Sequence, residues 1–131
     1  MAYVDGFLLP VPKRNLSRYR SIARRAGRVW MEHGALEYRE CTADDVGKMS
    51  GGFGKGVRLK TGEVVLFSWI VYRSKRQRDA VNKKVLKDPR ILALMTPDNK
   101  VFDEKRMAYG GFKAIVDLAK GRGQRSKGRG K

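Results

Sequence analysis

The chain is short of cysteine, of histidine and of long apolar segments. Cys41 is the only cysteine among 131 residues, so no intrachain disulfide is possible, and we expect a reducing, cytoplasmic compartment. No segment approaches transmembrane length, and we expect no signal peptide because the N-terminus lacks a basic start. One histidine and one cysteine do not suit a tetrahedral zinc site, so neither a metal nor a cofactor is predicted.

Acidic residues are also scarce. The chain has 30 lysines and arginines against 13 aspartates and glutamates, a net charge of +17. Its length fits one folded domain, which we place at residues 1–118. Residues 119–131 are rich in Gly, Arg and Lys, a composition typical of disordered tails. A chain this basic is expected to attract nucleic acid non-specifically.

Hydrophobic periodicity predicts the element order strand, helix, strand, strand, helix, strand. Pro10 and Pro12 should end the first strand, Gly34 the first helix, and a capping box from Ser74 to Gln77 should begin the second helix. With right-handed crossovers, this order fits an α+β fold, a ferredoxin-like sandwich with an antiparallel sheet and helices on one face. The predicted strands are residues 3–9, 35–43, 63–72 and 107–112, with a short one at 57–60, and the helices are 13–33 and 74–88. The inward positions expected on the second helix are Ala80, Val81, Val85 and Leu86.

The segment Glu63–Tyr72, EVVLFSWIVY, is polar on neither face, Ser68 excepted. A strand of this kind must be covered on both sides. One layer of helices covers one face, so we expect a second copy of the chain to cover the other. A homodimer would also stabilise a domain this small.

Five ordered segments together resemble the YbaA-like family of small uncharacterised bacterial proteins. They are YVDGF at residues 3–7, HGALEYRECTADDV at 33–46, VVLFSWIVYRSKRQRDAVNKK at 64–84, DPR at 88–90 and FDEKRMAYGGF at 102–112. The resemblance covers residues 3–117 and implies a ferredoxin-like fold of the dimeric α/β-barrel superfamily. It implies no activity and no catalytic residue. Members of that superfamily include monooxygenases, dehydratases, haem-degrading enzymes and ligand-binding domains, so the fold alone does not select a function.

Aromatic residues on the predicted strands suggest a pocket for a flat organic ligand between the sheet and its dimer mate. The same residues would equally serve as core and dimer interface. Asp5 lies within an apolar strand, and we expect Arg106 or Lys105 to pair with it. The candidate pocket residues are Tyr3, Asp5, Phe7, Trp69, Tyr109 and Phe112.

Other chemically notable residues have structural interpretations. His33 is expected to cap the first helix. Glu40, Asp44 and Asp45 are expected at a solvated strand end, and their charge opposes a Cys41 thiolate. The glycine-rich segment 44–56 lacks the Ser or Thr of a P-loop and is expected to be a connector or a mobile lid.

Three functions stay open from the sequence. The leading one is a homodimer that binds a small, aromatic metabolite, with or without catalysis. The second is a nucleic-acid-associating protein, and the third is a structural or regulatory dimer without a ligand. The candidate polyanion contacts are Arg18, Arg24, Arg25, Arg28, Arg122, Arg125 and Arg129.

Overall fold

The computed structural model describes residues 1–46 and 51–121. Its centre is a four-stranded antiparallel sheet in the order β2-β3-β1-β4. The strands are β1 (Tyr3–Pro12), β2 (Glu37–Thr42), β3 (Glu63–Tyr72) and β4 (Ala108–Lys113). The α-helices are α1 (Leu16–Glu32), α2 (Gly51–Gly56), α3 (Lys75–Val85) and α4 (Pro89–Leu94), and short 3-10 turns span Lys13–Asn15, Pro97–Asn99 and Glu104–Arg106.

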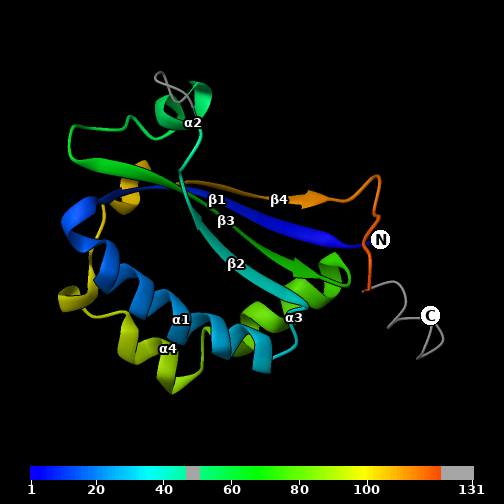
Figure 1. The fold of residues 1–131 in the computed structure, drawn as a ribbon. Coiled ribbons are helices and arrows are strands. Elements are labelled where there is room, and N and C mark those ends of the chain that lie inside the picture. The colour runs from blue at the N-terminus through cyan, green and yellow to red at the C-terminus, as the bar shows by residue number, and fades with distance from the viewer. Residues whose placement is uncertain (47–50, 122–131) are drawn as a thin grey trace.

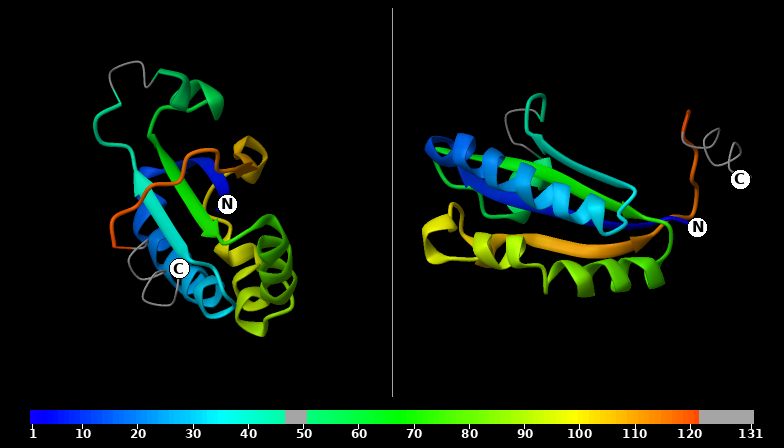
Figure 2. Two further views of the ribbon diagram at one scale, coloured as in Figure 1. Left: turned by 90° about the vertical axis from the view of Figure 1, so that its right-hand side faces the viewer. Right: turned by 90° about the horizontal axis from the view of Figure 1, so that it is seen from below.

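Helices α1, α3 and α4 lie on one face of the sheet, and α2 lies at the far end on the other side (Figure 1). Two further views show the same layering (Figure 2). The chain order and the strand order together give the ferredoxin-like α+β fold that the sequence predicts. No helix within residues 1–46 and 51–121 is long and apolar enough to cross a membrane.

β1 is longer than predicted. The predicted end was Leu9, yet the strand continues through Pro10 to Pro12. The Lys13 backbone N–H donates to the carbonyl oxygen of Gly62, just before β3, at 2.9 Å. Backbone groups alternate in direction along a strand, so those of Pro10 and Pro12 point to the β4 side. Pairing with β4 ends at Leu8. Neither proline therefore interrupts a ladder, because its missing N–H faces an unpaired edge.

The segment before β3 also differs from the prediction. Residues 47–50 of the predicted connector lie outside the described part, but Gly51–Gly56 form α2 in place of a free lid. The short strand predicted at 57–60 is absent from the described chain, and Val57 is fully buried instead. Phe53 of α2 packs on Phe67 of β3 with ring centroids 6.1 Å apart. Tertiary contact thus gives helical structure to a sequence whose glycines disfavour it.

The core lies between β3 and the helices. Tyr72, Val85 and Val81 are almost completely buried there, whereas Leu86 is 57% exposed. Ala80 is also exposed, so only two of the four inward positions predicted on α3 are correct. The helix begins where predicted, because the Ser74 side chain accepts a hydrogen bond from the Gln77 N–H at 3.1 Å.

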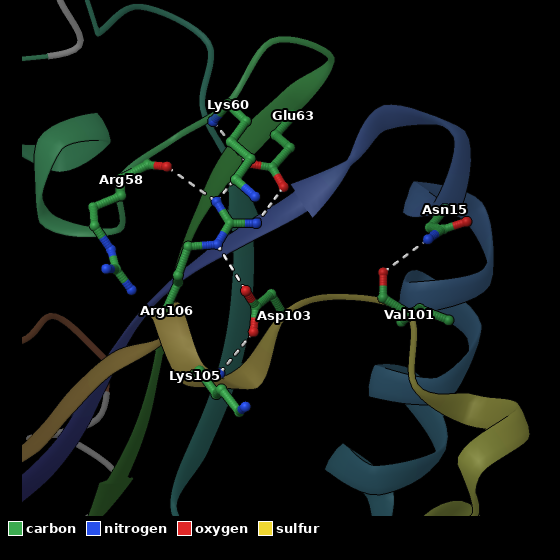
Figure 3. Close-up of polar contacts among 8 residues, drawn as sticks. All are labelled: Asn15, Arg58, Lys60, Glu63, Val101, Asp103, Lys105 and Arg106. Atoms are coloured by element: carbon green, nitrogen blue, oxygen red, sulfur yellow. Dashed lines mark hydrogen bonds and ion pairs between the residues drawn. The ribbon is translucent and has the colours of Figure 1, made fainter.

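Arg106 joins three segments at one end of the sheet (Figure 3). Its guanidinium donates to the Glu63 carboxylate, to Asp103 at 3.0 Å and to the Arg58 carbonyl oxygen at 3.0 Å. The hydrogen bonds from Arg106 to Glu63 lower the pKa of that carboxyl group. The ion pair is hidden from solvent, with 6% of the Arg106 side chain and 9% of the Glu63 side chain exposed. Removing one partner should therefore leave the other charge without compensation.

We expect Arg106→Met to destabilise the fold far more than Lys105→Met, which removes an equal charge from the neighbouring exposed position. Because Arg106 holds the pKa of Glu63 low in the folded state, its stabilisation is present at neutral pH and disappears as pH falls through that pKa. Urea unfolding at neutral and acidic pH tests this. Equal losses for the two variants, or a loss independent of pH, would contradict it.

Candidate functional site

The strand register decides which side chains meet beneath the helices. Glu40 of β2 lies opposite Ser68 of β3, which in turn lies opposite Phe7 of β1. All three therefore belong to the helix-covered face, because paired residues of neighbouring strands share a face. Ser68 is the single polar residue on that face of β3 between Val64 and Tyr72. The polar interruption of the apolar strand thus coincides with an acidic residue on its neighbour.

The Glu40 carboxylate is held by two phenols from different elements. Tyr19 of α1 donates to Oε1 at 2.9 Å, and Tyr38 of β2 donates to Oε2 at 2.8 Å. Ser68 also hydrogen-bonds this carboxylate. A carboxylate has about four acceptor positions. Three hydroxyl groups therefore use most of the acceptor capacity of this carboxylate.

Burial dominates the electrostatics of this cluster. It raises the pKa of Glu40 above its ordinary value of 4.5, although the three hydrogen bonds oppose the rise. Burial, followed by the charge of Glu40, raises the pKa of Tyr19 and of Tyr38. Both phenols are therefore protonated donors at neutral pH. A carboxyl group with a raised pKa in an aromatic setting is suited to accept a proton from a bound molecule.

The walls around Glu40 are aromatic and aliphatic. Trp30 of α1 packs near Tyr38 at 6.2 Å and donates its ring N–H to Asn82 of α3 at 3.2 Å. Phe102 meets the Tyr19 ring edge-on at 5.8 Å. Its loop is tied to α1 by a 2.9 Å hydrogen bond from Asn15 to the Val101 carbonyl oxygen (Figure 3). Trp30 and Phe102 are thus each held by contacts with another element of the fold.

Two spaces lie beside these residues. An inner cavity of about 200 Å³ lies between the sheet and α1, with Trp30, Phe7 and Ser68 among its walls. A wider groove of about 1110 Å³ runs along α1 beside β2. Tyr19, Tyr38 and Glu40 line both spaces. The carboxylate therefore borders both the groove and the cavity.

The structure divides the six pocket residues that the sequence proposed. The helix-covered face carries four of them, and Trp69 and Phe112 lie on the opposite, open face. Only Phe7 and Trp69 border the inner cavity. The sequence predicted a pocket between the sheet and a dimer mate, which would lie on the open face. The inner cavity instead lies on the helix-covered face, between the sheet and α1. The four residues on the helix side are Tyr3, Asp5, Phe7 and Tyr109.

Asp5 is paired, but with a residue that the sequence did not suggest. Its carboxylate accepts from Arg78 of α3 at 2.8 Å, in place of the predicted Arg106 or Lys105. The Arg78 guanidinium also lies over the Tyr3 ring at 4.8 Å. Burial raises the pKa of Asp5, and the charge of Arg78 opposes that rise. Arg106 is committed to other partners at the opposite end of β1, so it cannot pair with Asp5.

Other predicted positions are placed as follows. His33 is the C-cap residue of α1, as expected, and its ring contacts the Asp88 carboxylate at 2.9 Å. Asp44 and Asp45 are exposed at the end of β2. Glu40 is the exception to the predicted solvated strand end, because its register turns it under α1. The sequence did hold a signal for this placement: Glu40 is two residues from Tyr38 on the same strand, so the two side chains share a face.

The basic residues of α1 do not share one surface. Arg24 and Arg28 line the groove, whereas Arg25 and Arg18 do not. Arg18 instead donates to the Asp98 carbonyl oxygen. Binding of nucleic acid by these residues stays a prediction. Three of the proposed contacts lie outside the described residues: Arg122, Arg125 and Arg129.

The fold and this site define an α+β protein of ferredoxin-like topology, with a carboxylate-centred cavity between its sheet and its first helix. The chain belongs to DUF1428, a family described as proteins of unknown function, whose sequence pattern matches residues 2–104. The uncharacterized protein YbaA of Escherichia coli is 44% identical over 119 residues, which cover 89% of this chain and 99% of YbaA. The family resemblance seen in the sequence is therefore confirmed.

Solved structures share the fold at low sequence identity. SnoaB, a cofactor-independent oxygenase from Streptomyces nogalater, matches with a TM-score of 0.58 and 15% identity over 89% of this chain and 96% of its own. A NIPSNAP family protein from Agrobacterium tumefaciens matches with a TM-score of 0.59 and 16% identity over 93% of this chain and 100% of its own. At these identities the likeness establishes the fold alone.

The raised pKa of Glu40 makes a signed prediction for stability. Because the folded state holds this proton more tightly than the unfolded state, stability should fall as pH rises from about 4.5 through the raised pKa. Glu40→Gln should remove this component, and Tyr19→Phe should enlarge it by deleting a donor to the charged form. Urea unfolding across this pH range, with carbon NMR of the carboxyl group, measures both effects. A Glu40 carboxyl that titrates at or below its ordinary pKa would contradict the assignment.

Proposed function

We propose that this protein binds a small phenolic or similarly flat organic metabolite in the inner cavity, and that Glu40 accepts a hydrogen bond or a proton from it. The observation that carries the proposal is the Glu40 carboxylate, fixed by Tyr19 and Tyr38 within aromatic walls. Aromatic walls with a few fixed polar groups are characteristic of sites for organic ligands. The sequence-based alternative of a dimer without a ligand gives such an arrangement no role.

The size of the cavity bounds the ligand. Its volume of about 200 Å³ is below the roughly 300–1,000 Å³ of typical ligand sites. One ring fits inside, and any larger part must extend into the groove. Oxygenation, the activity named for SnoaB, is one reaction that a deprotonated phenol could enter. Binding and proton acceptance are what the residues of this chain support directly.

We further propose that the open face of the sheet is the contact between two copies in a homodimer. Phe67 of β3 and Phe112 of β4 are 47% and 63% exposed on this face. Trp69 is half-buried between them, with its ring N–H bonded to Glu37 at 2.7 Å. Large aromatic side chains grouped on one sheet face are typical of an interface. Dimerisation would give β3 the second cover that its composition requires.

Ligand binding is tested with para-cresol, a neutral phenol that places one ring in the cavity. We expect saturable binding by calorimetry, and about a tenfold loss of affinity in Glu40→Gln, since a hydrogen bond to a charged group is removed. Glu104→Gln is the matched control, because it makes the same change at an exposed position that lines neither the groove nor the cavity, and it should bind normally. If no phenol of a panel binds the unmodified chain, the proposed site is wrong. It is also wrong if Glu40→Gln binds para-cresol as tightly as the control variant does.

The dimer is tested by sedimentation and native mass spectrometry. We expect two copies for the unmodified chain and a shift to monomer for Phe112→Glu, because a buried carboxylate without a partner opposes association. Leu92→Glu is the control, since Leu92 is 53% exposed on α4, on the helix side. A dimer that survives Phe112→Glu but not Leu92→Glu would move the interface to the helices.

A further inference from the structure

The groove outside the cavity has an unusual balance of charge. Its basic side chains come from α1 and the turn before it, and its acidic lining residues are Glu32 and Glu40. Glu40 is engaged by the two tyrosines, and Glu32 is paired with Arg90 at 2.9 Å. Glu32 is therefore compensated by Arg90 outside the groove, and the four basic lining residues outnumber the two acidic ones. Its basic lining residues are Lys13, Arg20, Arg24 and Arg28.

Three of these residues form a row. Arg20, Arg24 and Arg28 are spaced by four residues, so they lie on one side of α1 about 6 Å apart along its axis. Within residues 1–46 and 51–121, none of the three makes an ion pair or a side-chain hydrogen bond. Other arginines of the fold, including Arg78 and Arg106, are paired with carboxylates. The row is thus one of the groups of basic residues in the described chain that have no acidic partner, and it is the one that lines the groove.

The row borders the same space as the proposed binding residues. Tyr19 and Glu40 line both the groove and the cavity, and Arg20 follows Tyr19 directly on α1. A molecule whose ring enters the cavity must leave its remaining atoms in the groove, beside the arginines. Guanidinium groups there suit a carboxylate or a phosphate, because they present paired donors to planar or tetrahedral oxyanions.

We propose that the natural ligand is an aromatic molecule with an anionic arm, a carboxylate or a phosphate, which Arg24 and Arg28 bind in the groove while the ring lies against Glu40. This inference rests on the proposed function and adds the class of ligand. The small size of the cavity and its shared lining favour one small anion over a nucleic acid, since bases in a strand need a series of stacking surfaces.

The test compares two probes that differ by one charge: para-hydroxyphenylpropanoate and its neutral methyl ester. At one fixed ionic strength, we expect the acid to bind the unmodified full chain about tenfold more tightly than the ester. The double variant Arg24→Gln/Arg28→Gln should lose this preference and retain ester binding. The single variant Arg25→Gln should retain the preference, because Arg25 is adjacent in sequence but does not line the groove. Arg24→Gln alone removes the same charge as Arg25→Gln, and it should lose part of the preference for the acid.

The outcomes separate this inference from the function on which it rests. If neither probe binds, the proposed function fails and the inference fails with it. If both bind equally well to the unmodified chain, the phenol site stands and the anionic arm is overturned. Equal losses in Arg24→Gln and Arg25→Gln would show that overall charge attracts the acid, which also overturns it. Single-stranded oligo-dT that binds through Arg24 and Arg28, with no preference for the acid over the ester, would assign the groove to nucleic acid instead.

Discussion

The central strand β3 is the constraint on which this structure depends, because apolar side chains line both of its faces. On the helix side, Leu66, Ile70 and Tyr72 are 4% exposed or less. Ser68 interrupts this apolar series and lies opposite Glu40. A carboxylate can be buried there because tyrosine and serine hydroxyls solvate it in place of water. The candidate site is therefore the one place on the helix-covered face where the core of β3 is not apolar.

The shortage of acidic residues shapes the electrostatics of the whole chain. Ion pairs that fasten the fold use several of them: Asp5 with Arg78, Glu63 with Arg106, and Asp88 with Arg90. With 13 acidic residues against 30 basic ones, many arginines have no acidic partner. On α1 three of these residues, Arg20, Arg24 and Arg28, line a groove that shares Tyr19, Tyr38 and Glu40 with the cavity. The groove along α1 is therefore positively charged, because the ion pairs named above engage acidic residues with arginines outside it.

Periodicity was sufficient for the fold and insufficient for the site. Alternation along Glu63–Tyr72 and the spacing of apolar residues on α1 predicted the layers, since both patterns follow from local backbone geometry. The placement of Glu40 required the register between β2 and β3. The same register separated Trp69 and Phe112 from the other four proposed pocket residues. One residue of register reverses the face of every side chain, and no local pattern reports it.

The sequence by itself determined the α+β class, the order of the elements, the excess of positive charge and the apolar composition of both faces of β3. These depend on composition and on short-range spacing. Tertiary structure alone decided that Pro10 and Pro12 could extend β1, that Gly51–Gly56 became a helix, and that Arg78 rather than Arg106 pairs with Asp5. It also brought Tyr19, Tyr38 and Glu40 together. The reason is the same in each case: these outcomes depend on which residues distant in the chain become neighbours, and packing settles that only when the strands and helices assemble.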